Sequence, residues 1–360
     1  MKDVVDDVRA WTARGDRVAI ATVVGVKRSA PRPPGAKMAV NEHGHVSGAV
    51  SGGCVEGAVV EVASEVLRER QARLLHFGIA DSEAWDVGLP CGGEIDVFAE
   101  EYAGSAASAF GEFASVAEQD GRAALVSILD GADTSAKLFV RPDGSTVGSL
   151  GDAELDRVAL VAADDLMWAE RSERLEVGDV TLFIDATAPA PRLVIFGAVD
   201  YSAALARLAR AAGWRPYVCD PRSQFATNGR FPEAEAVIAA WPAQAFEQIG
   251  AIDRATYIAV LTHDPKLDDA ALEIALRSEA PYVGAMGSRR AQAQRRERLL
   301  AAGLEEELLE RIAAPIGLDL GALTPEETAL SIMAEVVAVR HGREGGRLSQ
   351  AAGRIHEVGA

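Results

Sequence analysis

The sequence predicts an α/β protein that combines an N-terminal α+β domain, containing an internal strand-turn-strand-helix duplication, with a C-terminal doubly wound parallel sheet. A similarity between residues 36–50 and 136–150 indicates the duplication. Beyond residues 186–191, which are rich in Ala and Pro, short apolar runs alternate with helical segments, as in open parallel sheets. A chain of 360 residues is long enough for two or three domains, each with its own core.

The N-terminal domain is expected over residues 1–187, with copies at about 15–70 and 121–168. The segments that match are the strands 18–25 and 124–131, Ala36–Val40 and Ala136–Val140, Gly44 and Gly144, Gly48 and Gly148, and the apolar helical runs 54–69 and 152–168. Chance similarity between two short units is the alternative to a true duplication. The unit that repeats is a strand, a turn, a second strand and a helix.

The two copies differ in their turns. The first copy carries Ser29–Gly35, which contains three prolines, and the turn Ser51–Glu56, which contains two glycines and a cysteine. In the second copy, the segment that corresponds to Ser29–Gly35 is shorter. The segment that corresponds to the cysteine turn reads Gly151–Glu154 and contains no cysteine. We therefore expect the first copy to hold a site and the second to be scaffold.

The C-terminal domain is expected over residues 192–345, after a linker at 188–191 and before a tail at 346–360. The strands are predicted at 192–196, 215–220, 236–238, 256–261 and 281–284, and the helices at 203–212, 267–278, 289–302, 305–312 and 325–341. Strands that alternate with helices in this way are typical of a Rossmann-like, doubly wound fold.

Cys54 lies between two glycines and a predicted helix. The N-terminus of a helix carries partial positive charge and free N–H groups, which favour a thiolate and bind anions. Cys91 follows in a similar turn, next to Gly92 and Gly93. Lys27, Arg28 and Arg32 would add cations near Cys54 if the flanking strands form a hairpin. The alternative is that both thiols simply pack in a core, as free cysteines often do.

The first strand of the C-terminal domain ends at Gly197, where a dinucleotide site requires three glycines in the order Gly-x-Gly-x-x-Gly. Val199 and Ser202 replace the second and third glycines. Asp220 ends the next strand, where an acid that binds a ribose would lie. NAD(P) is thus one candidate ligand, and a Rossmann fold kept only for its shape is the alternative. Cys219 is expected in the core.

Two further loops are polar at the expected carboxyl edge of the parallel sheet. His263, Asp264 and Lys266 follow one buried strand, and open α/β sheets bind their ligands at this edge. Gly287, Ser288, Arg289 and Arg290 follow another strand and open a helix, which suits a phosphate. A solvated helix face is the alternative for the arginines. The chemistry of Pro315–Gly321 is not evident from its sequence.

The composition limits the partners. A formal charge of −18 repels nucleic acid and anionic membranes, so neither is expected as a partner. The acidic start of the chain has no apolar signal segment and no run is long enough to cross a bilayer, which predicts a cytoplasmic protein. Three widely spaced cysteines form no disulfide framework, and the six histidines show no spacing of a structural zinc site.

Six ordered motifs together resemble the XdhC/CoxI family of xanthine dehydrogenase accessory factors over nearly the whole chain. They are Ser29–Arg32 with Gly35–Met38, Ser51–Glu56, Cys91–Gly93, Leu261–Lys266, Val283–Arg290 and Pro315–Gly321. The resemblance implies an XdhC/CoxI domain followed by a Rossmann-like XdhC domain. Family members often read Gly-Ala-Gly-His after the first Rossmann strand, whereas this chain reads Gly197-Ala198-Val199-Asp200.

The resemblance further implies a carrier that binds molybdenum cofactor, protects it or assists its sulfuration, and delivers it to a xanthine dehydrogenase or CO dehydrogenase type molybdenum hydroxylase. A cysteine desulfurase or cofactor-biosynthesis protein is a further expected partner, and a homodimer the expected assembly. Cys54 and Cys91 are the expected molybdenum ligands. The other expected cofactor-binding residues are Gly52, Gly53, Glu56, Gly92, Gly93, Arg32, Lys37, Gly197, Asp220, His263, Asp264, Lys266, Gly287, Ser288, Arg289 and Arg290. An NAD(P)-dependent oxidoreductase and a purely protein-binding assembly factor are the competing functions.

Overall fold

The computed structural model describes residues 2–28, 30–78, 93–131 and 134–350. The chain divides into two compact units between Pro189 and Ala190. The first unit contains antiparallel sheets and the second a parallel sheet, which confirms the predicted fold class.

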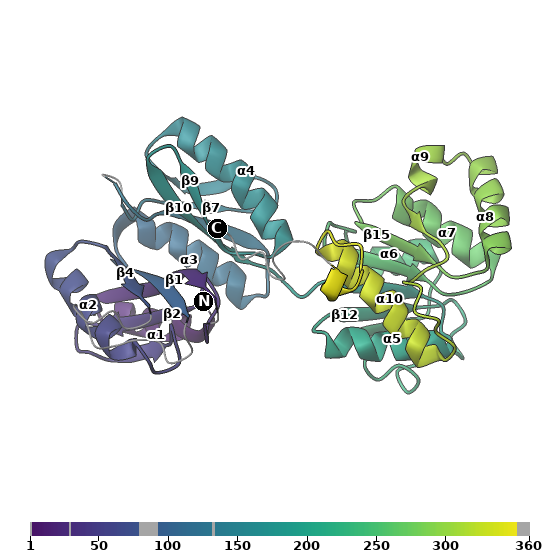
Figure 1. Ribbon diagram of the computed structural model, residues 1–360, viewed down its shortest axis with the longest axis horizontal. Helices are drawn as coiled ribbons and strands as arrows, with labels where there is room; N and C mark the ends of the chain where they lie inside the picture. The colour runs from purple at the N-terminus through teal and green to yellow at the C-terminus, as the bar shows by residue number, and fades with distance from the viewer. Residues whose placement is uncertain (1, 29, 79–92, 132–133, 351–360) are drawn as a thin grey trace. The chain divides into compact units, whose positions relative to one another are not determined.

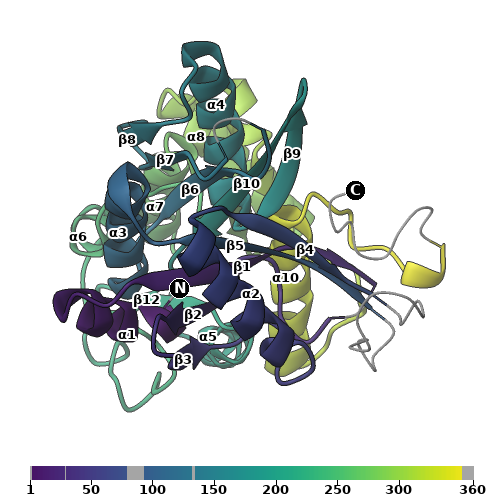
Figure 2. The ribbon, with the colours of Figure 1, turned by 90° about the vertical axis from the view of Figure 1, so that its left-hand side faces the viewer.

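The first unit holds two five-stranded antiparallel sheets with the same strand order. The order is β3-β2-β1-β5-β4 in one sheet and β8-β7-β6-β10-β9 in the other (Figure 2). The first sheet consists of β1 (Val18–Lys27), β2 (Lys37–Asn41), β3 (Val46–Gly48), β4 (Arg73–Phe77) and β5 (Glu94–Glu101). The second consists of β6 (Ala123–Ile128), β7 (Lys137–Val140), β8 (Thr146–Ser149), β9 (Glu173–Val177) and β10 (Val180–Thr187).

The helices of this unit repeat in the same way. They are α1 (Lys2–Ala13), α2 (Glu56–Glu69), α3 (Gly104–Glu118) and α4 (Ala153–Ala169). The apolar face of α2 packs on the first sheet and that of α4 on the second. The duplication is therefore longer than the sequence indicates, because each copy also includes a preceding helix and three further strands. We call Lys2–Glu101 copy one and Gly104–Thr187 copy two.

The second unit is a six-stranded parallel sheet in the order β13-β12-β11-β14-β15-β16, which is the strand order of a Rossmann fold, the fold class that the sequence predicts. Its strands are β11 (Arg192–Phe196), β12 (Arg215–Cys219), β13 (Ala236–Ile238), β14 (Thr256–Val260), β15 (Tyr282–Ala285) and β16 (Ile312–Ala313). Its helices are α5 (Asp200–Ala211), α6 (Pro242–Ile249), α7 (Pro265–Leu276), α8 (Arg289–Ala301), α9 (Glu306–Leu309) and α10 (Pro325–Arg340), followed by the short 3-10 turn η1 (Leu348–Gln350). Helices α5 and α10 cover one face, and α6, α7 and α8 the other (Figure 1).

Two elements of this unit differ from the sequence prediction. The helix expected at 305–312 ends at Leu309, because Ile312 pairs with Val283 and extends the sheet as β16. Helix α6 was not expected; it starts with Pro242 at its first position and buries Phe246. Within the described part of the chain, no helix is long and apolar enough to cross a membrane.

Candidate functional site

The cysteine turn of copy one has a backbone that only glycine adopts easily. Gly52 and Gly53 have φ angles of 91° and 120°. A Cβ atom added at either residue would meet no heavy atom within 4 Å, so open space surrounds both. The two glycines are thus required by backbone conformation and not by close packing.

The Glu56 carboxylate closes this turn. It accepts hydrogen bonds from the Ser51 hydroxyl at 2.6 Å and from the amides of Ser51, Gly52 and Gly53 at 2.8, 2.8 and 2.7 Å. Burial raises the pKa of Glu56, but the hydrogen bonds from Ser51 and Gly52 outweigh it and lower the pKa to about 2. The amides that were expected to bind an external anion therefore bind the chain's own carboxylate.

Cys54 sits on this closed turn with its side chain half-buried. Its amide donates to the Ser51 hydroxyl oxygen at 3.0 Å, and the residue packs at the edge of the copy-one core. Gly93 is buried directly before β5. Cys91 and Gly92 lie outside the described residues, so the second thiol remains a sequence prediction.

The expected cations of copy one have different surroundings. Arg28 is exposed, whereas Arg32 is partly buried and lies 3.8 Å from Asp3. Lys37 is buried and forms an ion pair with Asp185 of copy two. Its environment therefore differs from that of a ligand-binding lysine on the surface, because the packing of the two copies encloses its ammonium group.

A histidine with a carboxylate partner also lies in this unit, and sequence reasoning missed it. His76 Nδ1 and Asp96 Oδ1 are 2.7 Å apart, and Arg174 of copy two donates to the other Asp96 oxygen at 2.9 Å. His76 and Asp96 meet only because β4 pairs with β5. No local sequence pattern indicates this contact, since the two residues are separated by the connection 78–93.

One group of side chains in the described residues has the composition of a cation site. One ligand atom each of Asp16, Glu42 and His43 lies within 4.8 Å of the others. Asp16 already accepts hydrogen bonds from Asn41 and Arg14, and Glu42 accepts one from the Arg17 amide. We assign no ion to this group because Glu42 and His43 are exposed, and exposed acidic groups are common without a bound cation.

In the second unit, side chains of the protein occupy the turn after β11, where a dinucleotide would bind in a Rossmann fold. A Cβ atom at Gly197 would lie 2.5 Å from the Thr262 methyl group, so packing against the neighbouring loop requires this glycine. Asp220 is fully buried and accepts hydrogen bonds from the Ala198 amide at 2.8 Å and from Arg222 at 2.7 and 2.9 Å. The carboxylate that would take a ribose is thus occupied by Arg222.

The polar loops after β14 and β15 are joined at the carboxyl edge of the sheet. Asp268 accepts hydrogen bonds from Thr262 and, at 2.9 Å, from Arg295, which also donates to the Met286 carbonyl at 3.1 Å. Burial raises the pKa of Asp268 in spite of these bonds. This buried network fixes the two loops relative to each other.

The predicted ligand residues of these loops lie on the surface. His263, Lys266, Arg289 and Arg290 are exposed. Asp264 and Ser288 cap α7 and α8 by accepting hydrogen bonds from the amides of Lys266 and Ala291. Gly287 has a φ of 137° at the turn before α8. Their binding role remains a prediction.

Two other features of the second unit have structural roles. Cys219 is buried in the core as expected, and burial raises the pKa of its thiol to about 12. The start of the segment Pro315–Gly321 packs against the sheet and α10: the Gly317 amide donates to Glu335 at 2.8 Å, and the Ile316 side chain fills the space over Gly284.

These observations define a class of two-unit proteins, in which a Rossmann-like sheet accompanies a duplicated antiparallel domain whose first copy carries the thiol turn of Cys54. Comparison with known proteins gives the family. A model described as "XdhC and CoxI family" matches residues 11–78, and one described as "XdhC Rossmann domain" matches residues 193–336. The chain belongs to the XdhC/CoxI family.

Relatives of known name cover almost the whole chain. A protein of Bacillus subtilis, named as a probable subunit of xanthine dehydrogenase, is 30% identical over 90% of this chain and 94% of its own length. "Molybdenum cofactor insertion chaperone PaoD" of Escherichia coli is 28% identical over 92% of this chain and 86% of its own. A crystal structure named as a xanthine dehydrogenase from Bacillus halodurans shares the fold, with a TM-score of 0.58, 24% identity and coverage of 98% of both chains.

Proposed function

We propose that this protein is a molybdenum cofactor insertion chaperone that serves a xanthine dehydrogenase-type molybdoenzyme. Membership of the XdhC/CoxI family supports the proposal, as do the names of the relatives from B. subtilis and E. coli. The observation that carries it is the position of Cys54. Its half-buried thiol stands on a turn closed by hydrogen bonds in copy one, and the corresponding segment of copy two forms the first turn of α4 without a cysteine.

The residues fit a molybdopterin cargo. A thiolate is a soft ligand that suits the metal end of such a cofactor, and guanidinium groups suit its phosphate. Cys54 is the proposed contact to the molybdenum or its exchangeable sulfur. Arg28 is exposed and the Arg32 side chain is 41% exposed, and these two guanidinium groups are the proposed positive charge for the phosphate. Since Glu56 occupies the amides of Gly52 and Gly53, the phosphate is assigned to these arginines and not to the turn.

Further parts of the proposal rest on the family resemblance. Cys91 is the second candidate for a molybdenum contact, and the turn Ser288–Arg290 is a second candidate for the phosphate. Protection or sulfuration of the cofactor, cooperation with a cysteine desulfurase, a homodimeric state and a cytoplasmic location belong to the same proposal. The filled turn at Asp220 speaks against an NAD(P)-dependent oxidoreductase.

The test is anaerobic incubation of the full chain with molybdenum cofactor, followed by gel filtration and metal analysis. Co-elution with molybdenum is expected for the native protein, and a loss of roughly tenfold or more is expected for Cys54→Ala, since a lost ligand or ion contact costs on the order of 1.4 kcal/mol or more. Cys219→Ala, which alters only a buried thiol, is the matched control and retains the cargo. An Arg28→Ala/Arg32→Ala double variant should lose the cofactor but unfold in urea at the same concentration as the native protein.

Other outcomes decide between the functions. A native protein that never co-elutes with molybdenum contradicts the carrier role and favours a purely protein-binding adaptor. Undiminished retention in both Cys54→Ala and Cys91→Ala rules out the thiols as contacts. A saturable change of NAD(P)H fluorescence on titration with the protein supports an oxidoreductase instead.

A further inference from the structure

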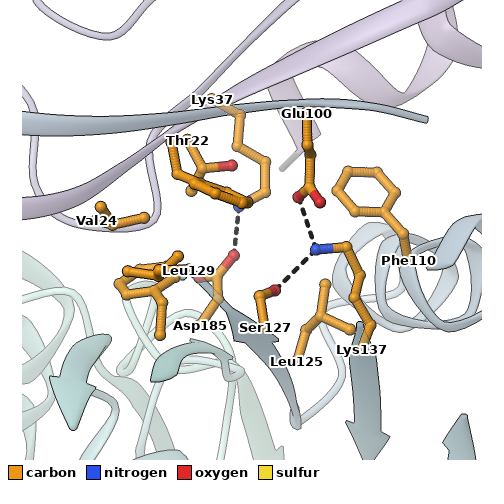
Figure 3. A pocket seen from close by; sticks show the side chains of 12 residues that line it. Thr22, Val24, Lys37, Glu100, Phe110, Leu125, Ser127, Leu129, Lys137 and Asp185 are labelled. Atoms are coloured by element: carbon orange, nitrogen blue, oxygen red, sulfur yellow. Dashed lines mark hydrogen bonds and ion pairs between the residues drawn. The ribbon is translucent and has the colours of Figure 1, made fainter. Parts of the chain in front are cut away.

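Two small cavities flank Glu100 in the first unit. One is lined by residues of both sheets, among them Thr22, Lys37, Ser127 and Asp185, and Figure 3 shows the Glu100 carboxylate pointing into it. The other lies beside Ile20 and Tyr102. In each cavity, the region that the centre of a water molecule can occupy has a volume of about 10 Å³. This is about the space that one water requires.

The charges around the first cavity are balanced. Lys37 of copy one pairs with Asp185 of copy two, and Lys137 of copy two pairs with Glu100 of copy one at 2.6 Å. Lys137 also donates to the Ser127 hydroxyl oxygen at 2.8 Å. The side chains of Lys137 and Glu100 are only 5% and 8% exposed. Because two cations face two carboxylates, an additional ion of either sign would leave a buried net charge.

One oxygen of this network has no hydrogen-bond partner among the described residues. Glu100 Oε1 accepts from Lys137, whereas Glu100 Oε2 is buried and accepts from no protein donor there. A buried carboxylate oxygen loses its hydration on folding and needs a donor in return. With the charges already balanced, a small neutral donor suits this oxygen best.

The corresponding carboxylate in copy two is fully satisfied. Asp185 accepts from Lys37 at one oxygen and from the Ser172 hydroxyl at the other, at 3.2 Å. The strand register places Glu173 opposite Ile184, so Ser172 precedes β9 at the level of Asp185. In copy one, Arg73 lies opposite Ala99, which places Ala72 at the level of Glu100. The donor that copy two supplies as a serine is an alanine in copy one.

We propose that the cavity shown in Figure 3 is a water site, and that one ordered water donates a hydrogen bond to Glu100 Oε2 in place of the missing hydroxyl. Water is neutral, fits the volume and finds further polar partners in Thr22 and Ser127, which line the cavity. The water completes the contact between the two copies. This inference does not depend on the proposed function.

The test is a crystal structure of the full chain at a resolution that shows ordered water, together with the number of long-lived waters from oxygen-17 relaxation dispersion. The native protein is expected to show one density peak within hydrogen-bond distance of Glu100 Oε2. In Ala72→Ser, the new hydroxyl takes over the bond, the peak disappears and the number of long-lived waters falls by one. Ser172→Ala is the matched variant in copy two and retains the water at Glu100.

Three results would overturn the proposal. One is an empty cavity in the native protein. Another is a peak that rubidium replaces, since this identifies a monovalent cation. The third is an Ala72→Ser protein that folds and keeps the water unchanged. If the serine variant fails to fold, the native crystal structure alone decides.

Discussion

Copies one and two differ most at the start of their second helix. In copy two, Asp152 caps α4 by accepting hydrogen bonds from Glu154 and Leu155 at 2.9 Å, and the helix begins at Ala153. In copy one, α2 begins only at Glu56, after the glycine turn. With Lys37 aligned to Lys137, the residues of the thiol turn occupy the place of the first turn of α4. The comparison teaches that the thiol lies where the same scaffold can form either a helical turn or a glycine loop.

In both copies, a carboxylate accepts hydrogen bonds from the residues that precede the second helix. Glu56 accepts hydrogen bonds from the amides of Ser51, Gly52 and Gly53. Asp156 accepts hydrogen bonds from the Ser149 hydroxyl and the Leu150 amide, both at 2.7 Å. The acid is therefore a structural element that the copies share. In copy one it accepts hydrogen bonds from four backbone amides, because the Val55 amide also donates to it at 3.2 Å, whereas in copy two it accepts from one.

The largest effect is expected where the copies are most alike, at the two buried ion pairs. Lys37→Met leaves Asp185 without its cation, and Lys137→Met does the same to Glu100. Removal of one partner of a buried pair costs about 3–5 kcal/mol, because the remaining charge stays desolvated. Both variants should therefore shift the urea unfolding transition of the first unit by a similar amount.

Two further variants control this experiment. In Lys37→Met/Asp185→Leu both charges are gone, and stability should return to within about 1–2 kcal/mol of the native value. Lys27→Met alters an exposed pair with Glu94 at 3.8 Å and should change stability by less than about 1 kcal/mol. A loss below that size for either buried lysine would show that the ion pairs do not hold the copies together.

The next effect tests the Glu56 carboxylate. Its pKa falls from an ordinary 4.5 to about 2, so it stabilises the fold fully above pH 4.5 and loses this contribution as the pH falls toward 2. Each pKa unit corresponds to about 1.4 kcal/mol, but solvent screens this partly exposed group and reduces the expected contribution to about 2 kcal/mol at neutral pH. Glu56→Gln should lose about this amount at pH 7 and approach native stability near pH 2.

Unfolding by urea at several pH values measures this difference, with Glu61→Gln on the exposed side of α2 as the control. A difference between Glu56→Gln and the native protein that stays constant from pH 7 to pH 2 would contradict the assignment. Asp156→Asn tests the same place in copy two, where the acid binds one amide and one hydroxyl, and a smaller loss is expected there.

Much of the fold could be predicted from the sequence, because it depends on local pattern. The apolar runs at 192–196 and 236–238 coincide with β11 and β13, and the similarity around Lys37 and Lys137 revealed the duplication. The thiol turn was recognisable for the same reason, since two adjacent glycines before a helix indicate unusual backbone angles.

Contacts that depend on tertiary packing could not be predicted. A lysine is usually exposed, and only the packing of one sheet on another buries Lys37 against Asp185. The sequence shows Asp220 at the end of a strand but not that Arg222 turns back onto it. His76 and Asp96 become neighbours only when β4 and β5 pair across a long connection. Candidate residues could thus be chosen from the sequence, while the partners of those residues required the structure.

The smallest effect tests the glycine turn itself. Gly52→Ala and Gly53→Ala place a side chain on positive φ angles of 91° and 120°, which costs on the order of 1 kcal/mol even though no atom is in the way. Gly57→Ala is the matched control, because this residue lies on α2 in open space, and alanine should stabilise the helix by about 0.5–1 kcal/mol. Urea unfolding measures these differences.

The rate of Cys54 alkylation in the same three variants shows whether the turn positions the thiol. If the turn is an opened helix end, as copy two suggests, alanine at residues 52 and 53 will shift the backbone toward the helical form of α4 and slow alkylation, while Gly57→Ala will leave the rate unchanged. Equal alkylation rates in all three variants would mean that the thiol is presented independently of the glycines, and that the difference between the copies lies in the cysteine alone.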